Sequence, residues 1–310
     1  MTIVEYISQG LFISESEFVS YTNTMPRRYK QFYIKKRNGE DRLIAQPAKT
    51  VKNLQLTVVG LLRDELRIHP AAMAYVKGRS IKDNAQKHVH NQFLLKMDFK
   101  NFFLSIKPAM FLMCLKKQGV NLDERDEHVI SNIFFWKLRR NSTLRLSIGA
   151  PSSPFVSNVV MYYFDEAVES LCRMLGVVYT RYADDLTFST NKKNVLFELP
   201  SVVKNVLNDV GLKAIKVNKD KTVFSSKKFN RHVTGVTLNN SGELSLGRER
   251  KRTISAMIHH HKLGLLNNED VTKLKGYLGF AKYVEPLFLT RMERKYGEQL
   301  ISQIQKFIPG

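Results

Sequence analysis

Residues 181–188 read RYADDLTF and place two adjacent aspartates, Asp184 and Asp185, between β-branched and aromatic residues. The apolar residues on either side predict a strand, a turn and a second strand over residues 177–189. Aspartate is common in turns, so a purely structural turn would also explain the pair. Two carboxylates held close together near a core, however, repel each other and are costly to ionise. Because a divalent cation removes that cost, the segment indicates a metal site at the tip of a hairpin.

A further acidic residue follows a strand earlier in the chain. Residues 93–99, FLLKMDF, predict a buried strand that delivers Asp98 at its end. Asp98 would also be explained as the cap of the next helix. Phosphoryl transfer with two metal ions needs oxygen ligands that converge from separate elements, with the ions about 3.5–4 Å apart. We therefore expect Asp98 to meet Asp184 and Asp185.

Small residues form the third motif, GAPSSP, at residues 149–154. Glycine and alanine allow a base pair or template to approach the backbone closely. A plain loop before a helix, with Pro154 near the first helical position, gives the same pattern without any ligand. Taken alone, this motif leaves both interpretations open.

The rest of the chain mixes strands with helices. Residues 33–44 predict a β-hairpin that turns at Asn38-Gly39. Short strands are expected over residues 233–246. Helices are expected within 1–30, over 51–67, 81–89, 108–117, 123–135, 155–175 and 199–210, and from 248 onward. Since strands and helices do not alternate strictly, the fold class is α+β.

The charge of the chain favours a polyanionic partner. The 310 residues include 49 Lys+Arg against 28 Asp+Glu, a net charge of +21 with a pI near 9.9. Over half of this excess lies in residues 211–310, whose net charge is +11. A localised basic face is typical of a nucleic-acid grip. A generally basic solubility surface and a membrane-surface protein are the alternatives that charge alone leaves open.

Cysteine usage and hydropathy point to a cytoplasmic protein. Cys114 and Cys172 lie in apolar surroundings without further Cys or His at metal-ligand spacing, so we expect core residues and no disulfide framework. The N-terminus has no signal-peptide pattern. The longest uncharged run, residues 146–164, contains two prolines and several polar residues, and no membrane span is expected.

Taken together and in this order, the three motifs resemble those of reverse transcriptases, over roughly residues 30–300 of the chain. The resemblance implies a right-hand polymerase with a small antiparallel palm sheet. Its N-terminal helices and fingers would span 1–90, its palm 91–240 with fingers helices inserted near 108–150, and its helical thumb 241–310. It further implies an RNA-directed DNA polymerase that uses two Mg²⁺ ions per active site, with Mn²⁺ able to substitute.

The same resemblance assigns the catalytic residues. Asp98, Asp184 and Asp185 match the catalytic aspartates of the family. Asp98, the backbone carbonyl of Phe99 and Asp184 would hold the metal ions, and Asp185 would support them at longer range or through water. Asn101 departs from the family pattern, since many members carry an acidic residue at that position, although not as an essential ligand.

Nucleotide-binding residues carry over one position at a time. Phe103 matches the steric gate that crowds a ribose 2′-OH, and its alternative is a core aromatic. Lys36 and Arg42 match the cations that bind the triphosphate, although both would also serve as solvated hairpin charges.

Three further positions complete this set. Ala150 and Pro151 belong to the motif that contacts template and incoming nucleotide. Lys221 matches the lysine that protonates pyrophosphate, with Lys219 as the alternative register.

Two short elements resemble the retron branch of the family. Residues 84–88, NAQKH, match an Asn-Ala-x-x-His element through Asn84 and His88. Residues 233–235, Val233, Thr234 and Gly235, match a Val-Thr-Gly element. In the thumb, a basic group would grip the nucleic-acid backbone without reading sequence. Its members are Arg248, Arg250, Lys251 and Arg252.

A retron assignment implies specific partners. The template would be a cognate noncoding RNA, the substrates dNTPs, the product a covalently branched RNA–DNA hybrid called msDNA, and a separate effector protein would act with the enzyme in anti-phage defence. Three alternatives stay open: a catalytically idle nucleic-acid-binding protein of this fold, a DNA-templated polymerase, and a group II intron-like reverse transcriptase. The chain ends after the expected thumb, which favours a retron enzyme over the last of these.

Overall fold

The computed structural model describes residues 2–35 and 39–308. Contacts divide the chain into two compact units, which are considered separately. The first contains Met1–Lys77, Lys96–Thr187 and Phe197–Val223, and the second contains Gly78–Leu95, Phe188–Leu196 and Phe224–Gly310. The predicted division into fingers, palm and thumb at residues 90 and 240 stays a prediction.

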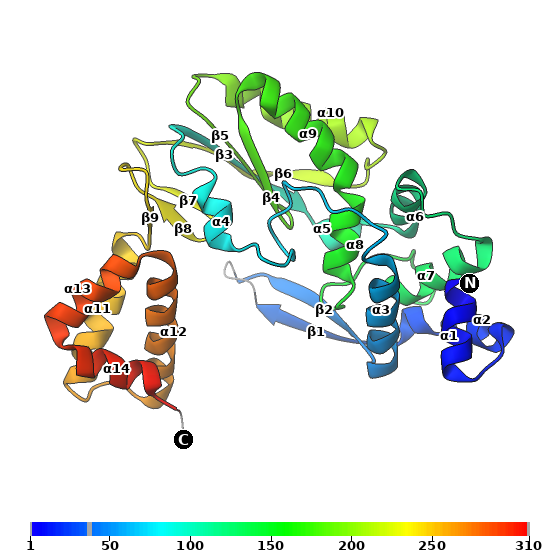
Figure 1. Ribbon diagram of the computed structural model, residues 1–310, viewed down its shortest axis with the longest axis horizontal. Coiled ribbons are helices and arrows are strands. Elements are labelled where there is room, and N and C mark those ends of the chain that lie inside the picture. The colour runs from blue at the N-terminus through cyan, green and yellow to red at the C-terminus, as the bar shows by residue number, and fades with distance from the viewer. Residues whose placement is uncertain (1, 36–38, 309–310) are drawn as a thin grey trace. The chain divides into compact units, whose positions relative to one another are not determined.

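Short capped helices open the first unit (Figure 1). Thr2 with Glu5, and Ser14 with Glu17, form capping boxes in which side chains satisfy the free N–H groups of each first turn. These helices pack against α7, a later helix of the same unit. The elements are α1 (Ile3–Leu11), α2 (Glu15–Thr22), the 3₁₀ turn η1 (Met25–Arg27) and α7 (Glu124–Phe134).

The predicted hairpin is present and longer than expected. Strands β1 (Tyr29–Lys35) and β2 (Asp41–Pro47) pair antiparallel from Tyr29 opposite Pro47 to Lys35 opposite Asp41. Gly39 has a φ of 84°, as a turn glycine should, whereas Asn38 lies outside the described residues. Helix α3 (Lys49–Leu62) follows and buries one apolar face.

A four-stranded sheet with the order β4-β5-β3-β6 carries the predicted hairpin and the Asp98 strand. Helix α9 packs on β4, and α10 packs on α9 (Figure 1). The single helix expected over 155–175 is two helices, because the backbone breaks at Met161. The elements are β3 (Phe93–Lys100), β4 (Val178–Tyr182), β5 (Asp185–Thr190), β6 (Lys216–Ser226), α5 (Phe102–Ser105), α6 (Pro108–Lys117), α8 (Ser153–Val160), α9 (Tyr162–Leu175) and α10 (Leu199–Asp209).

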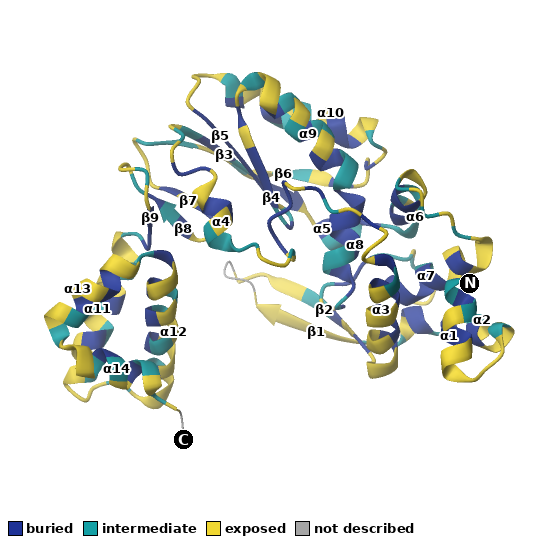
Figure 2. Cartoon of the chain, viewed as in Figure 1, coloured by how far each residue is buried: buried dark blue, intermediate teal, exposed yellow. Residues whose placement is uncertain are grey.

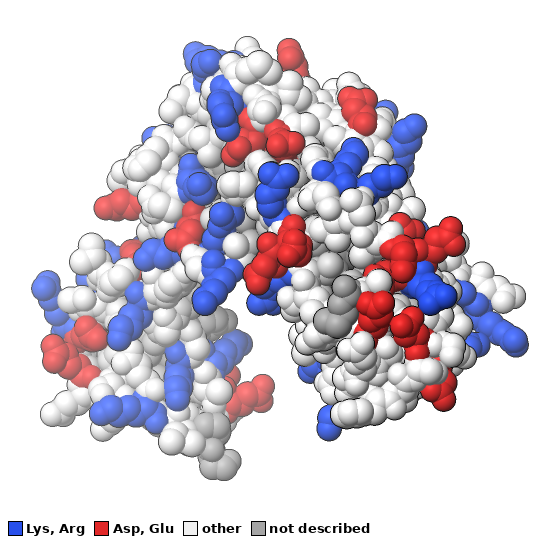
Figure 3. Space-filling model, turned by 45° about the vertical axis from the view of Figure 1, so that its right-hand side comes forward, with Lys and Arg blue, Asp and Glu red and all other residues white. Residues whose placement is uncertain are grey.

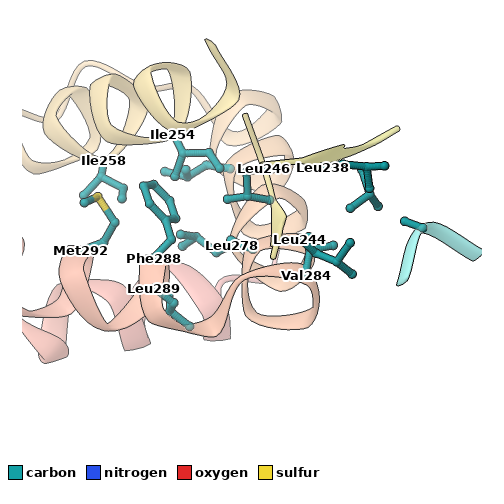
Figure 4. Packing of buried hydrophobic residues seen from close by; sticks show 14 of the residues in the cluster. Leu238, Leu244, Leu246, Ile254, Ile258, Leu278, Val284, Phe288, Leu289 and Met292 are labelled. Carbon is teal, nitrogen blue, oxygen red and sulfur yellow. The ribbon is translucent and has the colours of Figure 1, made fainter. Parts of the chain in front are cut away.

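The second unit packs helices around small strands. Helix α4 contacts strands β7 and β8 of a three-stranded antiparallel sheet. Ile254, Ile258, Leu278 and Phe288 meet in the core of the C-terminal helices (Figure 4). The elements are α4 (Ile81–Gln86), η2 (Val195–Glu198), β7 (Arg231–Val233), β8 (Val236–Leu238), β9 (Leu244–Ser245), α11 (Arg248–Lys262), α12 (Asn268–Val284), α13 (Pro286–Tyr296) and α14 (Glu298–Lys306).

Burial follows the amphipathic pattern of the helices and the apolar runs of the central strands (Figure 2). Cys114 and Cys172 are free and buried, as predicted. Among the described residues, no helix combines the length and the apolar composition that crossing a bilayer requires.

Candidate active site

A tight turn between β4 and β5 brings Asp184 beside the strand that carries Asp98. The turn residue Ala183 adopts the left-handed conformation, with a φ of 57°. The carbonyl oxygen of Asp184 accepts a hydrogen bond from the backbone N–H of Phe99, with an N–O distance of 3.1 Å. Because β5 and β3 are neighbours in the sheet, this bond fixes the hairpin tip against the end of β3.

The carboxylates of this site crowd one another electrostatically. Asp98 is only 7% exposed. Burial, and next the negative charge of Asp98, raise the pKa of Asp184. Asp185 is the most exposed of the three residues. Partial burial of its carboxyl group, and next the charges of Asp184 and Asp98, still raise the pKa of Asp185 to about 6. Burial and the neighbouring negative charges therefore disfavour ionisation of both Asp184 and Asp185.

Lys221 supplies positive charge at this point. It lies on β6, next to β3, and its Nζ atom is 2.8 Å from Oδ2 of Asp98. The hydrogen bond to Asp98 raises the pKa of Lys221. The lysine side chain is 60% exposed, whereas the Asp98 side chain is 9% exposed, so the ion pair joins an exposed cation to a buried carboxylate.

The donor set fits a hard divalent cation. Carboxylate and carbonyl oxygens are the ligands that Mg²⁺ prefers. Asp98, the carbonyl group of Phe99 and Asp184 lie at one end of two neighbouring strands, and burial with the charge of Asp98 disfavours ionisation of Asp184 without a cation. Within the described residues, no three His, Cys, Asp or Glu side chains gather closely enough to bind a metal by themselves. Asp185 in particular does not complete such a group.

The GAPSSP motif lines a pocket of about 300 Å³. Phe103 lines the same pocket, together with Ala150 and Pro151. Gly149 has a φ of 120°, and a side chain there would meet Cγ2 of Ile44 at 3.1 Å, so glycine is required where this loop crosses β2. The structure thus brings three of the predicted nucleotide-binding residues to one cavity.

Of the two predicted triphosphate-binding cations, one is described. Arg42 is exposed on β2, and its charge lowers the pKa of Asp184, so it lies within electrostatic reach of the carboxylates. Lys36 lies outside the described residues.

A buried ion pair that the motif analysis missed holds the hairpin in place. Arg181 and Asp165 are both 0% exposed, and Nη2 of Arg181 lies 2.7 Å from Oδ2 of Asp165. The same guanidinium donates to the carbonyl oxygen of Ala183 at 3.1 Å and to Oδ1 of Asn158 at 3.2 Å. Burial alone would lower the pKa of Arg181, and the charge of Asp165 more than offsets this. An arginine within an otherwise apolar strand was the sequence signal for this network.

Tyr75 is a second residue that the motifs did not identify. It lines the pocket, is 58% exposed and has a φ of 60°. Burial of its hydroxyl, and next the charge of Asp184, raise the pKa of Tyr75. Ser153 also lines the pocket, and its hydroxyl is buried with no hydrogen-bond partner among the described residues. Tyr75 lies outside the three motifs, whereas Ser153 belongs to GAPSSP, whose pattern did not single out its hydroxyl group.

In the second unit, the NAQKH and VTG elements pack together. Asn84, His88 and Val233 are each 0% exposed. The Oγ1 atom of Thr234 donates to the carbonyl oxygen of Ile81 at 3.2 Å, which ties the VTG turn to the start of α4. These buried side chains cannot touch RNA directly in this structure; they shape the surface above them.

Only part of the VTG turn is accessible. Thr234 and Gly235 have φ values of 47° and 81°, and Gly235 is exposed. Nη1 of Arg250 donates to the carbonyl oxygen of Gly235 at 3.2 Å, so this arginine braces the turn.

The four predicted thumb cations differ in their surroundings. Arg248 and Arg252 are exposed at the start of α11. Arg250 lies over the ring of Phe280, 4.8 Å from its centroid, and Lys251 pairs with Glu285 at 2.7 Å. Two of the four are thus engaged within the protein, and two project into solvent.

Comparison with known proteins places these features in a family. Residues 34–238 match the family described as "Reverse transcriptase (RNA-dependent DNA polymerase)". Among solved structures, telomerase from Candida albicans in complex with a TWJ fragment of telomeric RNA aligns with a TM-score of 0.51 at 14% identity. The alignment covers 94% of this chain and 59% of the telomerase chain. Together, these matches confirm the predicted α+β right-hand polymerase fold.

Curated relatives show to which branch of the reverse transcriptase family the chain belongs. The chain is 45% identical over 284 residues to Retron Ec83 reverse transcriptase of Escherichia coli, and the alignment covers 91% of each chain. It is 32% identical over 292 residues to Retron Ec73 reverse transcriptase of Escherichia coli, covering 91% of this chain and 92% of that one. The chain therefore belongs to the retron-type reverse transcriptases and is an RNA-directed DNA polymerase.

Proposed function

We propose that this reverse transcriptase copies a cognate noncoding RNA into covalently branched msDNA, and that it acts with a separate effector protein in anti-phage defence. The observation that carries the proposal is 45% identity to a retron reverse transcriptase over 91% of the chain, combined with an Asp98–Asp184–Lys221 site in the same chain. Template RNA and dNTPs are then its substrates.

The carboxylates are proposed to hold the metal ions. Enzymes of this family use divalent metal ions, and Mg²⁺ is the ion proposed here, with Mn²⁺ able to replace it. Asp98, the carbonyl oxygen of Phe99 and Asp184 would bind the two ions, and Asp185 would support the site from its outer edge. When bound, Mg²⁺ lowers the pKa of the primer hydroxyl group and balances the charge of the leaving pyrophosphate.

Lys221 is proposed to act on the leaving group. Its Nζ atom carries protons beside Asp98, at the edge of the carboxylate cluster. A side chain that is 60% exposed has room to leave Asp98 and donate a proton to an oxygen atom of the departing pyrophosphate. Lys221 would have to leave Asp98 before the transfer step, so that this carboxylate is free to hold metal when the leaving group departs.

The pocket is proposed to position the nucleotide. Ala150 and Pro151 would face the incoming base and template, and Arg42 would contact the triphosphate. Phe103 would lie against the sugar and exclude a 2′-OH by steric contact. Fixed placement of the substrate accounts for much of the rate in such enzymes, because it removes the entropy cost of alignment.

RNA recognition is proposed to involve the second unit. Thr234 and the exposed Gly235 would contact RNA on a surface whose shape depends on the buried Asn84, His88 and Val233. The thumb cations would add affinity through phosphates, without sequence readout.

The test isolates nucleic acid that copurifies with the protein expressed from its native locus. A denaturing gel, with and without RNase and DNase, is run for the wild type, for Asp184→Asn and for Asp209→Asn. Asp209 is exposed at the end of α10, so it provides the same chemical change away from the carboxylates. The expected result is a discrete species with an RNase-sensitive and a DNase-sensitive part, absent only in Asp184→Asn.

Other outcomes would redirect the proposal. Primer extension on an added RNA template without any hybrid species would retain the polymerase and discard msDNA synthesis. Extension on a matched DNA template but not on RNA would indicate a DNA-templated enzyme. RNA binding without extension in Mg²⁺ would indicate an idle binding protein. The gene for this chain and a neighbouring gene would also be deleted one at a time. If both deletions reduce protection against phage equally, the defence role is supported.

A further inference from the structure

An apolar surface runs along the first helix, away from the carboxylate site. Tyr6, Leu11, Phe12 and Ile13 are 44%, 48%, 95% and 38% exposed. We call these four residues the N-terminal surface. Four large apolar side chains exposed this close together in the chain are uncommon on a monomeric protein without a binding role.

A groove lies beside one end of this surface. Its volume is about 480 Å³, and its lining includes Ile3, Tyr6, Leu61 and Leu122. Asp126, on α7, forms part of the wall and is 3% exposed. Its carboxylate accepts hydrogen bonds from the backbone N–H groups of Ile3 and Val4 at 3.2 and 2.9 Å. Helix α1 is therefore fixed to α7, and the groove is preformed, which lowers the entropy cost of binding.

Phe12 ends α1 with a strained backbone that serves the helix cap: its N–H donates to the carbonyl oxygen of Gln9, and the N–H of Ile13 donates to that of Ser8. It adopts the left-handed conformation, with a φ of 56°, where glycine is the usual residue. For a residue with a side chain this conformation is strained. Because the Phe12 ring is 95% exposed, burial of the ring does not offset that strain. The cap accounts for the backbone at this position but not for an exposed aromatic ring, since glycine would form the same cap.

The charge of this region is opposite to that of the whole chain. Residues 1–25 contain three acidic residues and no Lys or Arg, and residues 119–135 have a net charge of −3, whereas the chain has a net charge of +21. Helices α1, α2 and α7 bring these segments together. Figure 3 shows several acidic side chains close together on this part of the molecule, with some basic side chains among them.

We propose that the N-terminal surface and its groove dock a basic protein segment that carries apolar side chains. Apolar contact with Tyr6 and Phe12 would provide affinity, and the acidic surroundings would select a Lys- or Arg-rich partner. Nucleic acid is a poor fit because negative charge repels phosphate. The inference rests on the proposed function only in that the function calls for a separate protein partner.

The test uses a fluorescently labelled amphipathic peptide made of leucine and lysine as the probe. A leucine–glutamate peptide of the same pattern and a lysine–serine peptide are its controls. A basic peptide is repelled by most of a chain with a net charge of +21, so its binding reports on the acidic region. Binding is followed by fluorescence anisotropy at low and high salt.

Two variants of the full chain probe the two parts of the proposal. Phe12→Gly removes the exposed ring and relieves the left-handed strain, so it should fold at least as well as the wild type. Glu124→Lys reverses one exposed charge at the start of α7. Leu287→Ser and Glu298→Lys make matched changes at exposed positions of the second unit.

We expect the leucine–lysine peptide to bind the wild type and both control variants alike. Phe12→Gly and Glu124→Lys should each weaken binding by roughly fivefold or more, as expected for a contact at the centre of an interface. Unchanged affinity in both variants, or equal binding of the lysine–serine peptide, would overturn the proposal. A further result would also overturn it: the wild type sediments as a dimer, the Phe12→Gly and Glu124→Lys variants sediment as monomers, and the peptide does not bind. The occupant of the surface would then be a second copy of this chain.

Primer extension on an RNA template, measured on the same preparations, separates this inference from the proposed function. Extension should be equal in the wild type, Phe12→Gly and Glu124→Lys. Loss of extension in those variants would place the surface in the polymerase and refute docking. A wild type that binds the peptide but makes no DNA would refute the proposed function and leave the docking surface standing.

Discussion

The role of Phe103 can be argued both from its place in the pocket and from the family resemblance. Phe103 lines the pocket with Ala150 and Tyr75, so its ring contributes to a cavity and is not simply part of the core. If the ring excludes a 2′-OH, Phe103→Ala should raise incorporation of rNTPs relative to dNTPs by about tenfold to a hundredfold. Single-nucleotide kinetics on an RNA template would measure this ratio. An unchanged ratio with intact dNTP use would show that Phe103 is only a packing aromatic.

The sequence alone did not show which other residues line the pocket or how far their side chains are buried. Tyr75 reaches the pocket only because its segment, far away in sequence, meets the GAPSSP motif there. Asn84 and His88 belong to a recognisable element, yet spacing could not show that both side chains are fully buried. A motif identifies a position in the chain, whereas the direction of a side chain depends on packing partners elsewhere.

At the scale of elements, the hairpin formed by β4 and β5 depends on one buried ion pair. Arg181→Met would leave the carboxylate of Asp165 buried without its partner, which should reduce the free energy of unfolding by about 3–5 kcal/mol. Arg173→Met is the matched control, because Arg173 pairs with Glu169 but is 78% exposed, and it should change stability by less than about 0.5 kcal/mol. Urea unfolding would measure both variants.

The double variant Arg181→Met with Asp165→Leu separates stability from positioning. It removes both charges, so much of the lost stability should return. Primer extension should nevertheless stay low, because no guanidinium then holds the Ala183 carbonyl group at the hairpin turn. Full recovery of extension along with stability would contradict a positioning role for Arg181.

A buried histidine that follows α4 and contacts β5 makes stability depend on pH. His88 is fully buried, its Nδ1 atom lies 2.7 Å from Oγ of Ser189, and burial lowers its pKa to about 3. In the unfolded chain the pKa is about 6.5. Between these two values the unfolded state binds more protons, so the free energy of unfolding falls as pH decreases below about 6.5.

Replacing His88 should remove this dependence. His88→Asn can retain a hydrogen bond to Ser189, and between pH 7.5 and 5.5 it should lose roughly 1 kcal/mol less stability than the wild type does. His259→Gln changes an exposed histidine on α11 and should leave the dependence unaltered. Urea midpoints across this pH range provide the comparison, and parallel curves for the wild type and His88→Asn would refute the effect.

Local pattern explains which elements could be predicted. The hairpin over 177–189 and the strand at 93–99 carry long apolar runs, and both occur where expected. Strand β6 was not predicted, because its sequence KVNKDKTVFSS is largely polar and mostly exposed, and its pairing with β3 defines it. The break at Met161 has no proline or glycine to mark it. These features follow from tertiary contacts and not from periodicity.

For the whole molecule, charge is unevenly distributed along the chain. The chain carries +21 overall, and residues 211–310 carry +11. The N-terminal segment over 1–25 has no basic residue. Template and product are polyanions, so their long-range attraction favours the basic surfaces and leaves the acidic surface free for protein.

Salt dependence of binding distinguishes thumb cations that contact nucleic acid from those that support the fold. Arg248 and Arg252 project into solvent, whereas Lys251 is paired with Glu285. Arg248→Ala and Arg252→Ala should each weaken binding of an RNA–DNA hybrid and reduce the slope of log affinity against log salt by about 1, while thermal stability is unchanged.

Lys251→Ala should behave differently, because it leaves Glu285 without its closest cation and thereby loosens the end of α12. We expect a lower melting temperature with little change in slope. Arg125→Ala, in the acidic region, is the control and should alter neither binding nor slope. Filter binding across a salt series and thermal melting give both quantities. Equal slopes for the wild type and Arg248→Ala would remove that arginine from the nucleic-acid interface, because each phosphate contact releases counterions and must appear in the slope.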